Sequence, residues 1–352
     1  MRGVYDHLFP VVREYVDTTT LNYIMACYSV FLATGHTIYQ RQVRASTIDK
    51  YLHAAATFIQ FFDKYPHRDS RKEMNTTAIC QPIRKVTDQV KRFENITEKR
   101  EAYTLAMQKE LHGQIQGCDI DGIDTALFEW FGKALQGGNR RYEWCQSRGR
   151  WRHTDFEKNP RGDCMAFTLN DIKFLGRGKT SMTMKYALEH LDEVYYAHVT
   201  YRWQKNGEHG LHKIYTRNER NAACDSVEHL LHICARFIRL VGADVTDRPL
   251  AIYKDATGTV RNITSDDVKH KMRQLATKVY NITNKEELSK WSSHSLRVGA
   301  CCILWAKGHS AEFIQRVLRW KSESWKDYVR DLLVHSQQHN ETMADVWEVP
   351  IF

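Results

Sequence analysis

The stretch that decides the interpretation of this chain lies near its end: His294-Ser-Leu-Arg297, then Leu318-Arg-Trp320, then Trp325-Lys-Asp-Tyr328. A histidine and an arginine three residues apart share one helix face, and a tyrosine follows on the next element. The planar guanidinium of Arg297 matches the non-bridging oxygens of a phosphodiester better than an ammonium group does. A phenolic oxygen becomes a good nucleophile when neighbouring cations favour the phenolate, so Tyr328 is a candidate nucleophile.

This cluster could also arise by chance. The chain holds 17 Tyr and 17 His, so a His-x-x-Arg followed by a tyrosine is by itself compatible with ordinary surface chemistry. Two upstream features favour the functional interpretation.

The first feature is a turn that presents an arginine. An amphipathic helix containing Trp130 and Phe131 runs into Gly137-Gly138, which permits a sharp turn before Asn-Arg140-Arg-Tyr-Glu143. Glu143 is placed to orient Arg140 by a hydrogen bond. The alternative is a surface Arg-Glu pair, which contributes little to stability.

The second feature is a predicted β-hairpin. An alternating aromatic and β-branched run covers 194–203, Asn206-Gly207 favours a tight turn, and a second run covers 211–216. Lys205 therefore lies at the hairpin turn, where it could reach into a groove. The alternative is a solvated charge that keeps a sheet edge soluble.

Taken together, these residues resemble the tyrosine recombinase/integrase family over roughly 98–352. The family pattern is a Gly-x-Arg-x-x-Glu/Asp turn, a hairpin lysine, His-x-x-Arg, a His or Trp, and a nucleophilic tyrosine. The matching residues are Arg140, Glu143, Lys205, His294, Arg297, Trp320 and Tyr328.

The resemblance implies site-specific DNA cleavage and rejoining through a 3′-phosphotyrosyl intermediate, with no metal and no nucleotide cofactor. Arg140, His294 and Arg297 would bind the scissile phosphate, Lys205 would protonate the leaving 5′ oxygen, and Tyr328 would attack. Trp320 would position the site and Glu143 would support it. The partners implied are double-stranded DNA with paired recombination sites and a homotetramer on that DNA, in the nucleus of a eukaryote or the nucleoid of a bacterium. The local sequence around Arg297 and Trp320 resembles most closely that of transposon-borne recombinases of microbial eukaryotes, such as Crypton-like elements.

The chain departs from the family pattern at three places. Many members carry Leu-Gly-His where this chain has Leu318-Arg319-Trp320, although Trp is an accepted variant there. The gap from Trp320 to Tyr328 is eight residues, about one shorter than is usual. The distance from Arg140 to Lys205 suggests an insertion over Asp155 to Lys185.

Length and charge agree with a DNA-binding enzyme of two domains. A chain of 352 residues with 42% hydrophobic content is long enough for two cores, and a formal charge of +9 favours a polyanionic partner. We expect a fold that is mainly α with a small β-sheet. The resemblance implies that a helical DNA-clamping domain covers 1–97, including its linker, and that an α+β catalytic domain covers 98–352.

Basic and aromatic residues alternate after the first turn, as expected where arginines contact phosphates and rings pack on sugars or bases. The alternative is a solvated loop. The residues concerned are Arg140, Arg141, Arg148, Arg150, Arg152, Lys158 and Arg161, with Tyr142, Trp144 and Trp151 between them.

Local patterns predict several helices. One covers Thr20 to Leu32, and another begins at a capping box over Ser46 to Asp49. The polar stretch Lys85 to Arg100 is expected to lead into a linker. Further helices are expected from Asp225 to Leu240, from Thr264 onward, and from His294 to Lys307. In the first domain, DNA contact is assigned to Arg41, Arg44 and Lys50.

The nine cysteines include no Cys-x-x-Cys pair, which predicts a reducing compartment rather than a disulfide framework. Glu228-His229-Leu-Leu-His232-Ile-Cys234 has the look of a metal site, but without a second ligand cluster the pattern favours alternation of core and surface over zinc. Neither a signal peptide nor a membrane span is expected.

Three alternatives remain open at this point. The apolar end Val346 to Phe352 could pack on its own domain or on a neighbouring protomer. The chemistry could be that of a type IB topoisomerase-like enzyme that relaxes DNA. The chain could also be a catalytically idle DNA-binding protein derived from a recombinase, although the complete set of polar residues is against it.

Overall fold

A computed structural model describes residues 18–35, 43–62, 69–73, 77–93, 100–145, 164–204, 209–320, 323–327 and 329. The chain divides into two compact units, Met1–Glu98 and Lys99–Phe352, and each is described by itself. Within the described residues, no helix is both long enough and apolar enough to cross a membrane.

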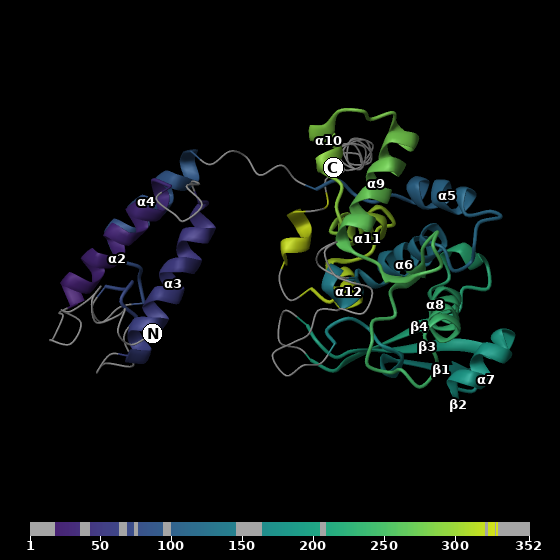
Figure 1. Ribbon diagram of the computed structural model, residues 1–352. Helices are drawn as coiled ribbons and strands as arrows, with labels where there is room; N and C mark the ends of the chain where they lie inside the picture. The colour runs from purple at the N-terminus through teal and green to yellow at the C-terminus, as the bar shows by residue number, and fades with distance from the viewer. Residues whose placement is uncertain are drawn as a thin grey trace, which may run out of the picture. The chain divides into compact units, whose positions relative to one another are not determined.

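Three helices that pack against one another form the described part of the first unit (Figure 1): α2 (Thr18–Ala33), α3 (Ala45–Phe62) and α4 (Gln81–Phe93). Their buried faces share a core that includes Met25, Leu52 and Ile83.

Two boundaries in this unit differ from the sequence-based prediction. Helix α3 begins at Ala45, so Ser46 is a helical residue and not the predicted cap. Helix α4 occupies much of the polar stretch that was expected to lead into a linker. Although most of its residues are polar, Ile83, Thr87 and Val90 recur at helical spacing; Ile83 lies in the core and Val90 packs against it.

The second unit is mainly helical. Its helices are α5 (Leu105–Gln114), α6 (Ile123–Gly137), α7 (Met184–Glu189), α8 (Ser226–Leu240), α9 (Ser265–Tyr280), α10 (Lys285–Ser289), α11 (Ser295–Ala306) and α12 (Ala311–Leu318). Helix α6 contacts both α8 and α11 (Figure 1), and nearly every residue along it is buried. The turn at its carboxyl end is therefore fixed by packing on both sides.

A four-stranded antiparallel sheet lies against α8 and has the order β2-β1-β3-β4. The strands are β1 (Ile172–Gly176), β2 (Ser181–Met182), β3 (Val194–Tyr201) and β4 (Leu211–Thr216), and a separate hairpin joins β5 (Ile252–Lys254) to β6 (Val260–Asn262). The described part of the segment Asp155 to Lys185, where an insertion was predicted, contains β1 and β2. Strand β1 is an inner strand whose Ile172 and Phe174 face the core.

Side chains at the helix starts explain where the major helices begin. Asp225 caps α8 by accepting a hydrogen bond from the backbone of Val227 at 2.8 Å. Thr264 and Asp267 form a reciprocal capping box at the start of α9. Helix α11 ends at Ala306, just before Gly308, which has a φ of 75°.

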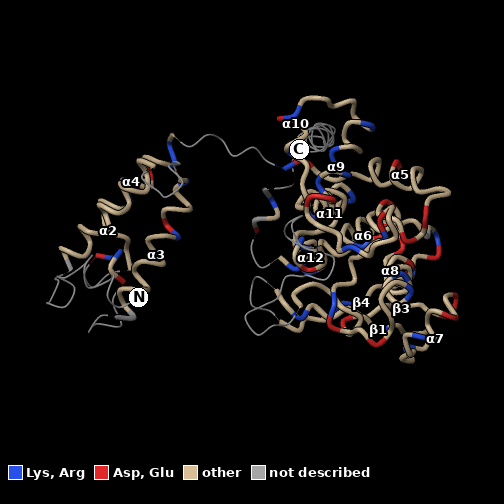
Figure 2. Tube along the Cα trace, in the orientation of Figure 1, with Lys and Arg blue, Asp and Glu red and all other residues tan. Residues whose placement is uncertain are grey.

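The prediction of a mainly α fold with a small β-sheet is confirmed. Lysine and arginine are interspersed with acidic residues along the described chain (Figure 2), so net charge alone does not mark one functional face.

Candidate functional site

The turn after α6 presents Arg140. Gly138 adopts the left-handed conformation, with a φ of 56°, and its hydrogen takes the place of a Cβ that would lie 2.8 Å from Cδ2 of Leu318. Glycine is required here both for the backbone angle and for the close approach of α12. A short 3₁₀ turn, η2 (Arg141–Glu143), follows, with Arg140 as its N-cap residue.

Glu143 organises this turn. Its carboxylate accepts hydrogen bonds from the backbone N of Arg140 at 2.9 Å, from Nη1 of Arg140 at 3.4 Å and from Nδ2 of Asn139 at 3.2 Å. Burial raises the pKa of Glu143, but the guanidinium groups of Arg319 and Arg140 and the hydrogen bonds outweigh it, so the pKa lies below its usual value. Glu143 is therefore ionised and holds Arg140 in place.

Arg297, on the first turn of α11, is 1% exposed. Its Nη1 donates to the carbonyl of Gly138, and its guanidinium carbon lies 4.0 Å from the centre of the Trp320 ring. Its Nη2 has no hydrogen-bond partner within the described part of the chain. Burial and the neighbouring charge of Arg140 lower the pKa of Arg297 to about 10, so the group remains a cation at neutral pH.

His294 is the N-cap residue of α11, one turn before Arg297. Its backbone N donates to Oγ of Ser292 at 3.3 Å, and its carbonyl accepts from the backbone N of Arg297 at 3.0 Å. The residue is half-buried at the start of the helix whose first turn carries Arg297.

The structure thus brings Arg140, Glu143, Arg297 and Trp320 together, with His294 at the start of the same helix as Arg297. Arg141 is half-buried in η2, and Arg44 and Lys50 are exposed on the first unit. The remaining predicted site residues lie outside the described residues: Arg41, Arg148, Arg150, Arg152, Lys205 and Tyr328. The chain on either side of Tyr328 is described: η6 (Glu323–Asp327) precedes it, and Val329 packs against a small core that includes Leu318 and Trp325.

Sequence reasoning missed Arg319. It is 6% exposed and donates to both carboxylate oxygens of Glu143, at 3.3 and 3.0 Å. The only signal in the sequence was an arginine at a position where glycine is common in the resembling family. Its partner is far away in the chain and could not be inferred from spacing.

Two lysines lie near the site, Lys133, which is buried, and Lys213, which is half-buried. Nζ of Lys133 donates to Oδ1 of Asn139 at 3.2 Å and to the hydroxyl of Tyr215 at 3.0 Å, and burial lowers its pKa well below the usual range. Nζ of Lys213, on β4, donates to the carbonyls of Val317 at 2.9 Å and Gln136 at 3.3 Å. Burial and the charge of Arg319 lower the pKa of Lys213 to about 7.

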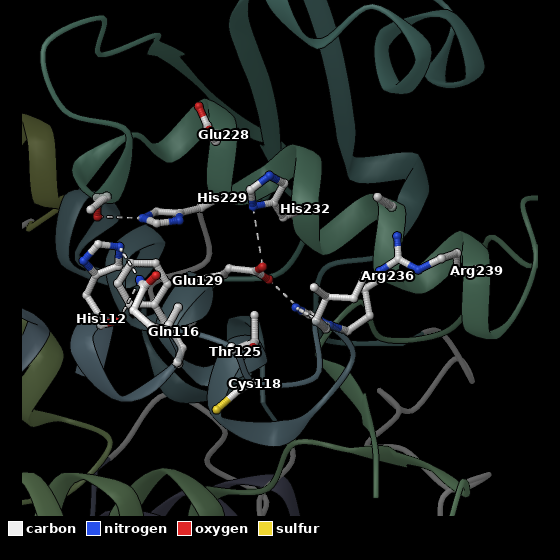
Figure 3. Close-up of a pocket in the computed structure, with 16 residues that line it drawn as sticks. His112, Gln116, Cys118, Thr125, Glu129, Glu228, His229, His232, Arg236 and Arg239 are labelled. Atoms are coloured by element: carbon white, nitrogen blue, oxygen red, sulfur yellow. Dashed lines mark hydrogen bonds and ion pairs between the residues drawn. The ribbon is translucent and has the colours of Figure 1, made fainter. Parts of the chain in front are cut away.

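A separate cavity of about 600 Å³ lies between α6, α8 and the turn that precedes α6 (Figure 3). Its charged groups are already paired. Arg236 donates to Glu129 at 2.6 Å, and Nδ1 of His232 lies 3.6 Å from the other oxygen of the same carboxylate. His229 is buried, which lowers its pKa to about 4. The predicted alternation of core and surface on α8 holds: Cys234 is fully buried and His232 is 47% exposed in its side chain.

In the described part of the chain, no three His, Cys, Asp or Glu side chains are grouped so that they could hold a metal ion.

No protein-family model and no curated protein sequence matches the chain. Solved structures that are similar to it are integrases and recombinases. The Tn1549 transposon integrase bound to transposon right end DNA is 13% identical, with a TM-score of 0.45, over 96% of this chain and 92% of that one. The XerA recombinase is 12% identical, with a TM-score of 0.39, over 95% of each chain. A lambda integrase dimer bound to a core site is 13% identical, with a TM-score of 0.39, over 94% of this chain and 96% of that one. At these values the likeness carries no functional argument, so the function is argued from the residues of the site.

Proposed function

We propose that the chain is a tyrosine-type site-specific DNA recombinase that cleaves and rejoins duplex DNA through a 3′-phosphotyrosyl intermediate. The observation that carries the proposal is Arg297, a buried cation with no carboxylate partner among the described residues and with Nη2 left without an acceptor. A buried charge of this kind is costly unless an anion completes it. A DNA phosphate supplies that anion.

The arginines bind the scissile phosphate. Arg140 and Arg297 donate to its non-bridging oxygens, His294 adds a third donor, and these contacts strengthen as negative charge builds up on the phosphorane. Glu143 keeps Arg140 fixed, and the Trp320 ring limits the movement of the Arg297 guanidinium. Because the donors are held before the DNA arrives, little reorganisation accompanies the reaction.

Tyr328 attacks the phosphorus. It attacks as the phenolate, after its phenolic proton has passed to water. The phenolate oxygen forms a bond to phosphorus while the bond from phosphorus to the 5′ oxygen breaks, and Lys205 gives its proton to that leaving oxygen. The phosphate at the 3′ end of the cleaved strand is then esterified to the oxygen of Tyr328. A 5′ hydroxyl from the partner strand attacks next, restores a phosphodiester and releases the tyrosine. No external energy source is needed, because one phosphoester is exchanged for another.

The proposed partner is double-stranded DNA that carries paired recombination sites, on which four copies of the chain assemble. In the first unit, Arg41, Arg44 and Lys50 would contact phosphates, and Arg141, Arg148, Arg150 and Arg152 would do so in the second. The proposed location is the nucleus of a eukaryotic host or the nucleoid of a bacterial one, with a transposable element as the source.

The test is a covalent-adduct assay with a suicide DNA substrate that is nicked near the scissile phosphate. We expect Tyr328→Phe to bind DNA and to form no adduct, because the change removes only the attacking oxygen. Tyr186→Phe, on the exposed face of α7, is the matched control and should form adduct as the wild type does.

The outcomes separate the alternatives. Adduct formation by Tyr328→Phe would move the nucleophile to another residue. An adduct followed by relaxation of supercoiled DNA, without recombinant product from paired sites, would indicate the topoisomerase-like alternative. DNA binding without any adduct in the wild type would indicate the idle DNA-binding protein.

A further inference from the structure

Arg319 occupies a backbone position that favours glycine. It follows α12 in the left-handed conformation, with a φ of 58° and a ψ of 50°, which side chains with a Cβ adopt at a cost. Among the described residues, Lys179 and Asn281 are the other two non-glycine residues with positive φ, and both are exposed. Arg319 combines a strained backbone with a buried side chain, so its side chain has to contribute something that offsets the backbone cost.

The side chain of Arg319 connects four segments. Its two terminal nitrogens form a bidentate ion pair with Glu143. Nη1 also donates to Oε1 of Gln204 at 3.4 Å, and Nη2 donates to the carbonyl of Gly137 at 3.4 Å. The guanidinium carbon lies 3.5 Å from the centre of the Tyr201 ring. The contacts join the end of α12 to η2, to the end of α6 and to the end of β3.

The carboxylate that pairs with Arg319 is that of Glu143, which also holds Arg140 in place. Oε2 of Glu143 receives both Nη2 of Arg319 and the backbone N of Arg140, and Oε1 receives Nη1 from each arginine. Without Arg319, the Glu143 carboxylate would still accept hydrogen bonds from Arg140. It would lose the paired hydrogen bonds from Arg319 that fix the orientation of the carboxylate plane. The position of Arg140 therefore depends on an arginine that is remote from it in sequence.

Arg319 also sets the neighbouring side chains. It stands between Leu318, which packs against the Gly138 turn, and Trp320, whose ring lies beside Arg297. Anchoring Arg319 on Glu143 consequently fixes where Trp320 is placed. One side chain thus holds both the Arg140 turn and the residue that stacks on Arg297.

We infer that Arg319 is a positioning residue for DNA cleavage: it locks Glu143, Arg140 and Trp320 into the geometry that receives the scissile phosphate. The inference rests on the proposed function. Arg319 does not contact DNA itself, because its side chain is 3% exposed and both terminal nitrogens donate hydrogen bonds to protein oxygens. Its contribution is to orientation, where a displacement of about 1 Å slows a reaction roughly 10²-fold.

The test compares Arg319→Gly with Asn281→Gly in the suicide-substrate assay. Both changes place glycine at a left-handed helix end, so both relieve the backbone, but only the first removes a buried guanidinium. We expect Arg319→Gly to bind DNA about as tightly as the wild type and to form the Tyr328 adduct roughly 10²-fold more slowly. Asn281→Gly should cleave at the wild-type rate.

Chemical rescue distinguishes positioning from a general loss of structure. Arg319→Gly leaves a space beside Glu143 that fits a guanidinium ion, so added guanidinium at millimolar concentration should restore at least about tenfold of the lost rate. Urea, which has the same shape and no charge, should not. Arg319→Lys keeps the charge but not the paired donors, and should cleave at a rate between those of Arg319→Gly and the wild type.

The possible failures are distinct. A wild type without any adduct overturns the proposed function and this inference with it. A wild type that forms adduct, together with an Arg319→Gly variant that cleaves equally fast or that responds equally to urea and guanidinium, overturns the inference alone. If Arg319→Gly does not fold, Arg319→Lys decides the matter: an undiminished cleavage rate would refute the positioning role.

Discussion

Replacing Arg297 with methionine should abolish cleavage without destabilising the protein. Burial lowers the pKa of Arg297 from its usual value to about 10. A shift of that size corresponds to a cost on the order of 3 kcal/mol for keeping the cation in the folded state. The folded-state pKa is the lower one, so this cost is fully present at pH 7 and declines only as the pH rises through about 10 toward the unfolded value.

The contacts that the substitution removes are smaller than this cost. Loss of the hydrogen bond that the charged guanidinium donates to the Gly138 carbonyl costs about 1.5 kcal/mol, and loss of the contact with the Trp320 ring costs about 1 kcal/mol. The methionine side chain is unbranched and flexible enough to fill the space. The free energy of unfolding of Arg297→Met should therefore equal that of the wild type or exceed it by up to about 1 kcal/mol.

Urea unfolding at pH 7, together with the suicide-substrate assay, measures both effects. Cleavage should fall by at least about 10²-fold, as for removal of a donor that stabilises transition-state charge. Arg236→Met is the matched control: that guanidinium is also buried, but it pairs with Glu129 at 2.6 Å, so its loss should cost about 3–5 kcal/mol. An Arg297→Met variant that is as unstable as Arg236→Met would mean that Arg297 has a partner within the folded chain, and the reasoning would be refuted.

Three further outcomes are expected. Cleavage should persist in excess EDTA without nucleotide, because arginines and a lysine supply the cationic stabilisation that metals give other nucleases; loss on chelation and recovery with magnesium or zinc would contradict this. Lys205→Ala should cleave normal DNA roughly 10²–10⁴-fold more slowly and recover on DNA with a bridging 5′ sulfur, since a thiolate leaves without a proton; failure to recover would move the acid role to Lys213 or His294. Lys213 has a folded pKa of about 7 against the usual 10.5, so the unfolded chain binds more protons between these values. Urea unfolding should therefore show the wild type gaining up to about 1.4 kcal/mol per pH unit over that window relative to Lys213→Met, and parallel pH profiles for the two proteins would show that Lys213 is not so perturbed.

Local patterns were sufficient where one segment carries its own signal. Asp225 and Thr264 predict the starts of α8 and α9 correctly, because a capping side chain hydrogen-bonds to backbone groups two or three residues away. The Gly138 turn follows from the same kind of short-range constraint. Such features can be predicted because the residues that interact are neighbours in sequence.

Long-range packing explains the errors. Strand β1 was not predicted, because its place in the sheet comes from pairing with β3, which follows it by about twenty residues. Helix α4 looked like a linker because three aligned side chains, and not its mean polarity, decide its burial. Arg319 reaches Glu143 across 176 residues, a contact that no local spacing indicates.

The pattern of paired and unpaired buried cations bears on whether the site is active. Arg236 and Arg319 are each buried against a carboxylate, as structural ion pairs are. Arg297 is equally buried beside two further arginines and gains no such partner among the described residues, so it costs the folded protein stability. A protein that only bound DNA through its surface would be more stable with an apolar residue at position 297. Because Arg297 is buried, that replacement would remove no contact that surface binding requires. Under the proposed function, a scissile phosphate would enter that site, and the negative charge that it gains in the transition state would offset the cost of keeping the cation.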